Sequence, residues 1–314
     1  MRAVRSTGED VAGRDVEVVD VADPDAGVVV TIRSASICGS DFGYIRGGSR
    51  FVLGHELAGT LDDGTAVAIE PTFGCGVCDQ CLGGHPNRCR RSDFRVPGLT
   101  MDGGMSERYA VGEENLVPLP VGLDVADACL VEPAAVGWHG ARVGGVGAGQ
   151  RVAVVGGGSI GILAAAAARA QGADEVALEA RHHHQREAGE RLGAGRVRGE
   201  YEVVIEAAGT EESLARTVGL AAPGGTVVVL GVYGERLPLP FIPAFMKEVR
   251  VVGSIAYCRL GERRDVDAAA AMLAASPEIA AALVTHRFPL EDAVHAFAVA
   301  RSREAGARKV VVAP

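Results

Sequence analysis

The distribution of apolar and polar positions divides the chain near residue 150. Before that point, short apolar runs such as 27–36 and 64–71 are bounded by Gly and Pro, which predicts short strands joined by turns. After it, apolar runs of strand length alternate with runs of helix length. We expect strands at 151–158, 174–180, 201–209, 226–232 and 249–256, and helices at 159–173, 182–194 and 211–225. This alternation predicts an α/β fold with a parallel sheet covered on both faces.

The last part of the chain adds further elements, and the composition limits the class of protein. The stretch 265–302 is predicted to form two helices around a short connection, and 308–314 a final strand. With 314 residues, 48% of them hydrophobic, the chain is large enough for two globular domains. Its net charge of −9 argues against a nucleic-acid partner, which normally selects a basic surface. The N-terminus lacks the apolar core of a signal peptide and the most apolar stretch is interrupted by glycines, so we expect a cytoplasmic protein without a membrane span.

Four of the seven cysteines lie close together, at Cys75, Cys78, Cys81 and Cys89. Disulfides are rare in the cytoplasm, so clustered cysteines favour a metal. The spacing C-x-x-C-x-x-C, with a fourth Cys eight residues later, places four thiolates on one loop and suits a tetrahedral zinc ion. Four protein ligands leave no position for water or substrate, so this zinc is predicted to be structural. The alternative, a zinc ribbon that binds nucleic acid, is disfavoured by the negative net charge.

A second candidate metal site draws on residues that are far apart in the sequence: Cys38, His55, Glu56 and Glu132. One thiolate, one imidazole and one carboxylate would leave the fourth position on zinc open, which is the arrangement of a catalytic site. Each residue also has an ordinary structural explanation, because a lone Cys is commonly a small buried apolar residue and a lone His a hydrogen-bonded core residue. Spacing alone therefore leaves both interpretations open.

A glycine-rich turn follows the first strand of the second half. Gly156, Gly158 and Gly161 form G-x-G-x-x-G before a predicted helix that begins with Ser159 and Ile160. In this context the pattern is a dinucleotide-binding fingerprint, because the glycines let the backbone approach a pyrophosphate at the helix N-terminus. An ordinary glycine-rich turn is the alternative, and the flanking strand and helix disfavour it.

The end of the next strand bears on which nicotinamide cofactor is bound. NAD-binding domains of this kind carry an Asp or Glu there, which accepts hydrogen bonds from the ribose hydroxyls. Here Ala180 takes the expected position and is followed by Arg181 and His182. A guanidinium would bind an anionic 2′-phosphate that a carboxylate would repel, so we predict NADP(H) rather than NAD(H). Glu179, one residue earlier, could still bind the ribose, which keeps NAD(H) as the alternative.

Several motifs occur in an order typical of one enzyme family: CGSD, GHE, the four-cysteine loop, VEPAAVGWHG, VVGGGSIG and VVIEAAG. Over nearly its whole length the sequence resembles the zinc-dependent medium-chain dehydrogenases, specifically the sorbitol and threonine dehydrogenase branch. The resemblance implies two domains. A GroES-like, mostly antiparallel β catalytic domain is expected at 1–133 and 257–314, and a Rossmann dinucleotide-binding domain at 134–256.

The resemblance also implies roles for the second metal site. In this family the residues that match Cys38 and His55 bind the catalytic zinc. The residue matching Glu56 is a ligand or lies next to one, and Glu132 matches an acidic residue that binds zinc directly or through water. Ser40 matches the residue that hydrogen-bonds the substrate oxygen and starts a proton relay. The implied reaction is hydride transfer between an alcohol, stabilised as an alkoxide by zinc, and a nicotinamide ring.

The sequence departs from the family pattern around the metal. Many relatives carry a His shortly after CGSD that extends the proton relay, but Gly43 stands at that position. The proton would then leave through Tyr44, water or the cofactor ribose. Sixteen residues separate Cys38 from His55, fewer than relatives usually have, and the segment 60–71 is also short. Because such loops shape the pocket, the sequence does not select one substrate.

These features favour a zinc- and NADP(H)-dependent dehydrogenase that reversibly converts a secondary alcohol, polyol or sugar-like substrate to a ketone. One alternative is a primary-alcohol or aldehyde reductase with the same zinc site. Another is a nucleotide-binding protein without turnover. The strand at 249–256 could pair with a second subunit at the sheet edge, as in relatives, so a homodimer or homotetramer is expected.

Overall fold

The computed structural model describes residues 1–91, 95–261, 263–302 and 304–314, and the chain divides into two compact units. Unit 1 comprises Met1–Glu132 and Leu260–Pro314, and unit 2 comprises Pro133–Arg259. The boundary falls inside helix α3 (Val131–Val143). Every helix in the described ranges is too short or too polar to cross a lipid bilayer.

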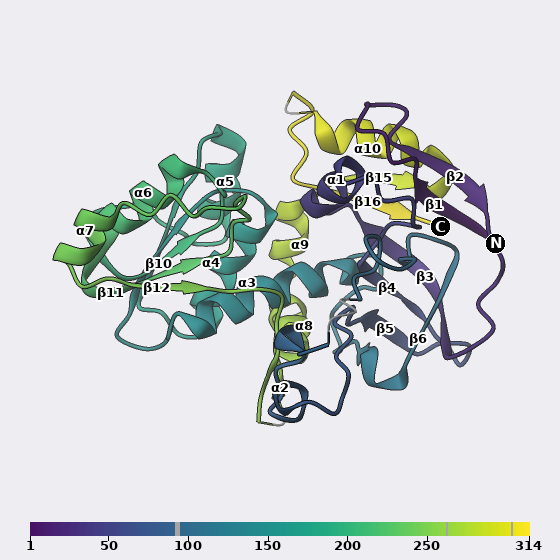
Figure 1. Ribbon diagram of the computed structural model, residues 1–314, viewed down its shortest axis with the longest axis horizontal. Coiled ribbons are helices and arrows are strands. Elements are labelled where there is room, and N and C mark those ends of the chain that lie inside the picture. Colours follow the sequence, from purple (N-terminus) through teal and green to yellow (C-terminus); the bar gives the residue numbers. More distant parts are fainter. Residues whose placement is uncertain (92–94, 262, 303) are drawn as a thin grey trace. The chain divides into compact units, whose positions relative to one another are not determined.

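Unit 1 is built on a mostly antiparallel sheet (Figure 1). Its strands are β3 (Val28–Ser36), β4 (Glu56–Thr60), β5 (Ala66–Ile69), β6 (Arg108–Val111), β7 (Leu116–Pro118), β15 (Val284–Pro289) and β16 (Lys309–Ala313). Over the described residues they lie in the order β15-β16-β3-β4-β5-β7, and β6 pairs with β3. The β15–β16 pair is parallel, while the others are antiparallel. A separate antiparallel hairpin is formed by β1 (Arg2–Ser6) and β2 (Val16–Asp20).

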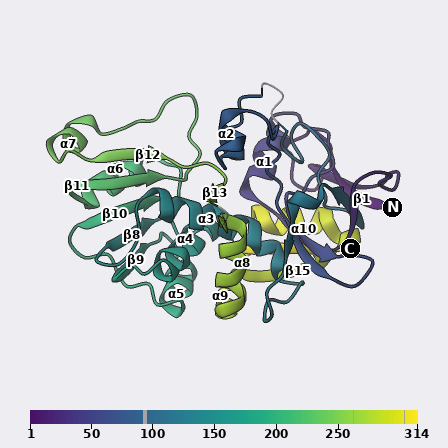
Figure 2. The ribbon, with the colours of Figure 1, turned by 90° about the horizontal axis from the view of Figure 1, so that it is seen from below.

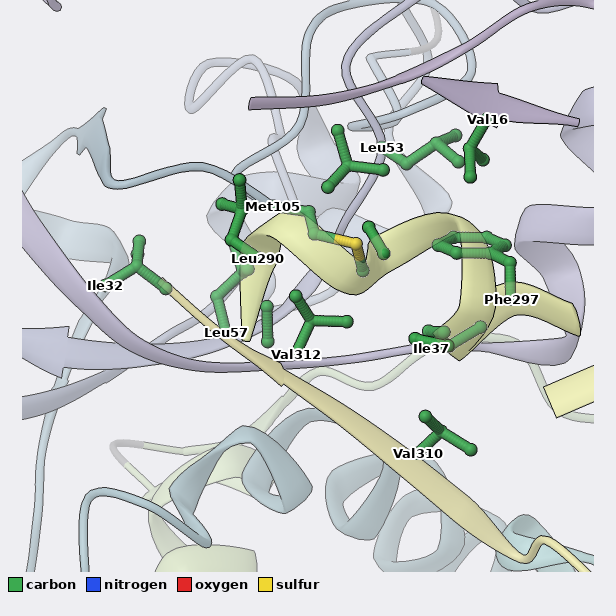
Figure 3. Packing of buried hydrophobic residues seen from close by; sticks show 14 of the residues in the cluster. Val16, Ile32, Ile37, Leu53, Leu57, Met105, Leu290, Phe297, Val310 and Val312 are labelled. Atoms are coloured by element: carbon green, nitrogen blue, oxygen red, sulfur yellow. The ribbon is translucent and has the colours of Figure 1, made fainter. Parts of the chain in front are cut away.

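The core of unit 1 lies between helix α10 (Ala293–Arg301) and the strands against which that helix packs. The helical elements of this unit are α1 (Gly39–Arg46), α2 (Asp79–Leu82), α8 (Asp265–Ala275), α9 (Glu278–Leu283), α10 (Ala293–Arg301) and the short 3-10 turns η1 (Pro86–Arg88), η2 (Glu113–Asn115), η3 (Ala128–Leu130) and η4 (Leu290–Asp292). Helix α10 packs against β16, β15 and β2. Figure 3 shows Leu290 and Phe297 in one buried cluster with Leu57 and Val312. Burial of each such side chain contributes about 1.5–3 kcal/mol to folding.

The C-terminal part of unit 1 differs from the sequence prediction. Two helices were expected over 265–302, but this fully described stretch contains α8, α9 and α10, with strand β15 between α9 and α10. The strand was missed because its sequence, VTHRFP, is rich in polar residues and ends in Pro, and alternates only weakly. It is a strand because its backbone pairs in parallel with the apolar strand β16.

Unit 2 contains the predicted parallel sheet. Its strands are β8 (Arg151–Val155), β9 (Glu175–Glu179), β10 (Tyr201–Glu206), β11 (Ala221–Val229) and β12 (Arg250–Gly253), and its remaining helices are α4 (Ser159–Ala170), α5 (His183–Arg191), α6 (Glu211–Leu220) and α7 (Phe241–Met246). In the described part of the unit the strands lie in the order β12-β11-β10-β8-β9 (Figure 2). All neighbouring pairs are parallel. Helix α4 packs against β8 and β9, and α6 packs against β10 and β8.

One helix boundary in unit 2 was predicted wrongly. The helix expected at 211–225 ends at Leu220, and the chain passes directly into β11. Pro223 has no backbone N–H for a helical bond, and Gly224 has a φ of 72°, so neither continues a helix.

Candidate active site

Three residues of unit 1 bring a thiol, an imidazole and a carboxylate together. The ligand atoms of Cys38, His55 and Glu56 all lie within 4.8 Å of one another. Cys38 is the N-cap of α1, directly after β3, and Glu56 is the first residue of β4. Strands β3 and β4 pair antiparallel with Ser36 opposite Glu56, so residues distant in sequence meet at the same end of the strand pair. The chain approaches this point through a tight turn at Gly54, which has a φ of 99° and would place a Cβ 2.6 Å from the backbone nitrogen of Met105.

Asp41 stands behind the imidazole. Its carboxylate is fully buried, and one oxygen accepts a hydrogen bond from the Cys38 backbone N–H at 2.9 Å. The other oxygen lies 3.5 Å from His55 Nδ1, and neither of these two buried atoms has a hydrogen-bond partner within the described residues. This leaves His55 Nε2 facing Ser40 Oγ at 3.3 Å. A carboxylate behind Nδ1 is the arrangement that orients a metal-binding histidine.

The electrostatics of this cluster favour a cation. Burial lowers the pKa of His55, but the negative charges of Cys38 and Asp41 outweigh it and raise this pKa well above the usual value. Glu132 adds to the same effect. A set of potential anionic donors around an imidazole whose protonated form is stabilised fits a bound cation, and the donor set of sulfur, nitrogen and oxygen is one that zinc accepts.

Glu132 stands apart from the three-residue cluster. It is the second residue of α3 and is partly exposed. Although close enough to raise the pKa of His55, it is not in the group of described residues whose ligand atoms lie within 4.8 Å of one another.

Ser40 connects this cluster to Tyr44. The Ser40 hydroxyl donates to Cys38 Sγ at 3.1 Å, and Ser40 lies close enough to Tyr44 to affect the pKa of the Tyr44 hydroxyl. The Tyr44 and His55 rings have centroids 5.9 Å apart. Burial raises the pKa of Tyr44. Its hydroxyl therefore stays protonated at neutral pH and can act as both donor and acceptor.

A buried lysine that the sequence pattern did not predict contacts Glu56. Lys309 Nζ lies 2.8 and 2.7 Å from the two carboxylate oxygens, and the Ser36 hydroxyl donates to the same carboxylate. Burial lowers the pKa of Lys309, but the charge of Glu56 raises it above the usual lysine value. The signal that could have found this residue is a charged side chain at the start of the apolar strand β16.

The four cysteines of the loop also converge. The sulfurs of Cys75, Cys78, Cys81 and Cys89 all lie within 4.8 Å of one another, and all four are free thiols. Backbone N–H groups point at them: that of Cys78 donates to Cys75 Sγ, that of Cys81 to Cys78 Sγ and that of Cys75 to Cys89 Sγ, at 3.3–3.5 Å. Hydrogen bonds from backbone N–H groups lower the pKa of Cys78 to about 6. Four sulfurs with this support fit a closed tetrahedral zinc site.

The glycine fingerprint of unit 2 lies where β8 meets α4. A Cβ at Gly156 would lie 2.7 Å from backbone atoms of Ala207, and one at Gly161 would lie 1.8 Å from the Gly156 carbonyl oxygen. Gly158, the N-cap of α4, is exposed and has open space where a side chain would start, and Ser159 and Ile160 begin the helix. The turn therefore packs tightly on its inner side and presents bare backbone at a helix N-terminus, which suits a pyrophosphate.

The three residues predicted to contact the ribose follow β9. Ala180 is nearly buried, with its methyl group against Gly157, while Arg181 and His182 are exposed. His182 is the N-cap of α5. Arg186 Nη1 donates to the carbonyls of Ala180 and Arg181 at 3.0 and 3.1 Å, which braces the turn between the strand and the helix.

Comparison with known proteins agrees with this arrangement. The sequence matches the family described as alcohol dehydrogenase GroES-like domain over residues 24–121, and that described as zinc-binding dehydrogenase over residues 196–275. L-Galactonate-5-dehydrogenase of Escherichia coli is 30% identical over 292 aligned residues, covering 83% of this chain and 84% of that protein. Sorbitol dehydrogenase of Rattus norvegicus is 31% identical over 332 aligned positions, covering 91% and 90%.

A solved structure gives the same result. A zinc-binding dehydrogenase from Sinorhizobium meliloti, bound to NADP, is 31% identical with a TM-score of 0.86, and the match covers 100% of this chain and 99% of that one. Identity of about 30% over most of the chain shows the family to which the protein belongs. The chain is a member of the zinc-dependent medium-chain alcohol and polyol dehydrogenases, oxidoreductases that use a nicotinamide cofactor.

Proposed function

We propose that this dehydrogenase transfers hydride reversibly between NADP(H) and a secondary alcohol, polyol or sugar-like substrate, with the ketone as the oxidised product. The relatives named for sorbitol and L-galactonate support a polyhydroxylated substrate, and the S. meliloti structure contains NADP. We propose unit 1 as the catalytic domain and unit 2 as the nucleotide-binding domain, close to the predicted divisions at 1–133 with 257–314 and at 134–256.

The observation that carries this proposal is the cluster of Cys38, His55 and Glu56 within 4.8 Å. Cys38 and His55 are proposed to hold a catalytic zinc, with Glu132 or Glu56 as the carboxylate ligand. Zinc bound there would stabilise the alkoxide form of the alcohol, and the nicotinamide ring would accept its hydride. Lys309 contacts both carboxylate oxygens of Glu56, and Glu132 lies close enough to His55 to raise its pKa, which together support Glu132 as the carboxylate ligand.

Ser40 is proposed to handle the proton of the alcohol. Its hydroxyl oxygen would accept the proton as the alkoxide forms and pass its own proton to Tyr44 or to water. Tyr44 lies close enough to Ser40 for the Ser40 side chain to affect its pKa, and this closeness supports the route in a chain that has Gly43 where relatives carry a histidine.

The four-cysteine loop is proposed to hold a second, structural zinc through Cys75, Cys78, Cys81 and Cys89. Its role would be to fix a loop that has almost no helix or strand of its own, apart from the single turns α2 and η1. The preference for NADP(H) is supported by the apolar Ala180 and the exposed guanidinium of Arg181.

We also propose that the enzyme pairs with a second copy of itself through β12, forming a homodimer or a tetramer of such pairs. This strand is an edge of the sheet within the described part of unit 2. Beside it lies an apolar groove of about 570 Å³ lined by Leu239, Phe245, Val249 and Val251, among others. Phe241, Phe245 and Met246 of α7 are 62–73% exposed, an apolar surface that a second copy would cover. Light scattering on the purified protein tests this, and a monomer at micromolar concentration would contradict it.

The test of the activity is a substrate panel. We expect NADP reduction with polyols and secondary alcohols, NADPH oxidation with the matching ketones, and loss of both with a zinc chelator. Aldehydes reduced faster than ketones would favour the primary-alcohol alternative. Metal analysis should find about two zinc ions per chain. A chain that holds one zinc, resists reconstitution and turns over no substrate would be a nucleotide-binding protein instead.

A further inference from the structure

The carboxylate of Glu179, at the end of β9, forms an ion pair with Arg216. Glu179 is the last residue of this strand, which lies next to β8 in the sheet (Figure 2). Its backbone carbonyl accepts a hydrogen bond from the N–H of Gly156 at 2.9 Å, so Glu179 stands directly beside the glycine turn. Arg216 Nε lies 2.9 and 3.0 Å from its two carboxylate oxygens, and Arg216 Nη2 lies 2.8 Å from one of them.

The pair is accessible rather than part of the core. The side chain of Glu179 is 38% exposed and that of Arg216 is 48% exposed. Without Arg216 the carboxylate would be free to accept hydrogen bonds from a ligand at the end of β9. Arg216 reaches it from α6, a helix that packs against β10 and β8 and begins at a capped turn in which Thr210 accepts from the N–H of Ser213. The guanidinium is therefore supplied by a different element from the one that carries the acid.

Two arginines follow β9, one in the turn after the strand and one on α5. Arg181 is exposed, and Arg186 is fixed by the carbonyls of Ala180 and Arg181. Glu187, an acid on α5, lies 3.5 Å from His183 Nδ1. With Glu179 neutralised by Arg216, the end of β9 presents guanidinium groups without an opposing free carboxylate of its own.

We propose that Arg216 determines cofactor choice by holding the Glu179 carboxylate away from the ribose. A free carboxylate at this position would accept hydrogen bonds from the two ribose hydroxyls of NAD and would repel the dianionic 2′-phosphate of NADP. Bidentate pairing with a guanidinium removes both effects. This inference rests on the proposed use of NADP(H), and it makes Arg216 a positioning residue that acts through Glu179.

Two fragments of the cofactors test this without zinc, substrate or turnover. Isothermal titration calorimetry with 2′,5′-ADP and 5′-AMP measures binding at the adenosine end alone. The unaltered protein should bind 2′,5′-ADP more tightly. In Arg216→Ala the affinity for 5′-AMP should rise and that for 2′,5′-ADP should fall, each by about three- to fivefold, the size expected for an exposed ion pair. Arg216→Lys keeps the positive charge but loses the paired N–H donors of the guanidinium, and it should give an intermediate ratio of the two affinities.

A double variant tests whether the effect of removing Arg216 acts through the Glu179 carboxylate or only through the lost positive charge. Glu179→Gln alone should leave the 5′-AMP affinity unchanged within twofold, because the carboxylate is already occupied. In Arg216→Ala with Glu179→Gln, the gain in 5′-AMP affinity should disappear. Arg196→Ala is the matched control, since Arg196 is an exposed arginine of the same unit, 3.8 Å from Glu190, and its loss should not change the ratio of the two affinities.

The outcomes distinguish this inference from the proposed function. If the unaltered protein prefers 2′,5′-ADP and Arg216→Ala retains the same ratio, the inference about Arg216 is wrong and the preference for NADP(H) stands. A gain in 5′-AMP affinity that persists in the double variant would also overturn it. Equal affinity of the unaltered protein for both fragments would refute the proposed preference for NADP(H), and the role of Arg216 with it.

Discussion

Lys309 Nζ lies 2.7 and 2.8 Å from the two carboxylate oxygens of Glu56, and both side chains are almost entirely buried, at 3% and 0% exposure. The two residues are 253 positions apart in the sequence, and they meet because β16 and β4 both pair with β3. The carboxylate that the family resemblance singled out as a possible metal ligand is thus also half of a buried ion pair.

Removal of the lysine should destabilise the protein strongly. Lys309→Met leaves the Glu56 carboxylate buried without its partner, and we expect a loss of about 3–5 kcal/mol in the free energy of unfolding measured in urea. Arg108→Met is the control in the same unit: Arg108 Nη2 lies 2.8 Å from Asp23, but both side chains are nearly half exposed, so we expect a loss below about 1 kcal/mol. Equal losses in the free energy of unfolding for the two substitutions would show that the buried ion pair contributes no more to stability than the exposed one.

The same ion pair predicts how stability depends on alkaline pH. Lys309 has a pKa raised in the folded state, so its contribution is fully present below the unfolded lysine value of about 10.4 and is lost as the pH rises through the folded value. The chain contains one other lysine, Lys247. Urea unfolding between about pH 10 and pH 12 should therefore show a fall in stability that is absent from Lys309→Met. An identical dependence of stability on pH in both proteins would mean that another titrating group causes the fall.

Asp41 should control metal retention. In Asp41→Ala the imidazole of His55 loses the carboxylate behind Nδ1, and the Cys38 backbone N–H loses its acceptor. We expect metal affinity, measured by competition with a chromogenic chelator, to fall about 10- to 100-fold. Asp41→Asn retains an oxygen acceptor, so its metal affinity should fall less than that of Asp41→Ala. Unchanged zinc content in Asp41→Ala would show that the ring is oriented by other contacts.

Loss of one loop cysteine should remove one zinc and leave the other. Cys89→Ala breaks a closed set of four ligands, and we expect zinc content to fall from about two to about one per chain, with faster proteolysis of the loop. Cys129→Ala removes a buried thiol that lies outside the loop and should leave the zinc content unchanged. A variant that loses both ions would indicate that the loop supports the catalytic site as well.

Arg181 should bind the 2′-phosphate directly. Arg181→Ala removes an exposed guanidinium at the start of the turn into α5. We expect the KM for NADP to rise about 10- to 100-fold, the size of a lost charge-assisted hydrogen bond, with little change in the KM for NAD. A parallel rise in both values would point to a distorted turn rather than a lost phosphate contact.

The elements that the sequence predicted are those with a strong local signal. The parallel sheet was recognisable because β8, β10 and β11 contain the apolar runs VAVV, VVI and VVV, and the cysteine cluster because its four members lie within fifteen residues. Strand β15 was missed because its backbone pairing with β16, which leaves no local pattern, decides it. The end of α6 was misplaced although Pro223 and Gly224 are local signals against a helix.

The parts of the site that escaped prediction depend on contacts between distant segments. Lys309 and Glu56 are 253 residues apart, and Arg216 and Glu179 are 37 residues apart on different elements. Asp41 lies inside a recognised motif, but its position 3.5 Å from His55 Nδ1 follows only from the folded structure. Partners of this kind cannot be read from spacing, because the topology and not the sequence separation brings them together.

The alignment of Ser36 with Glu56 across β3 and β4 has a consequence for folding. A slip of one residue between these strands would turn the Glu56 side chain to the opposite face of the sheet, away from Cys38 and His55. Only the native register can therefore assemble the three donors. A spectroscopically visible ion such as cobalt would thus report, during refolding, the moment at which these two strands acquire their correct alignment.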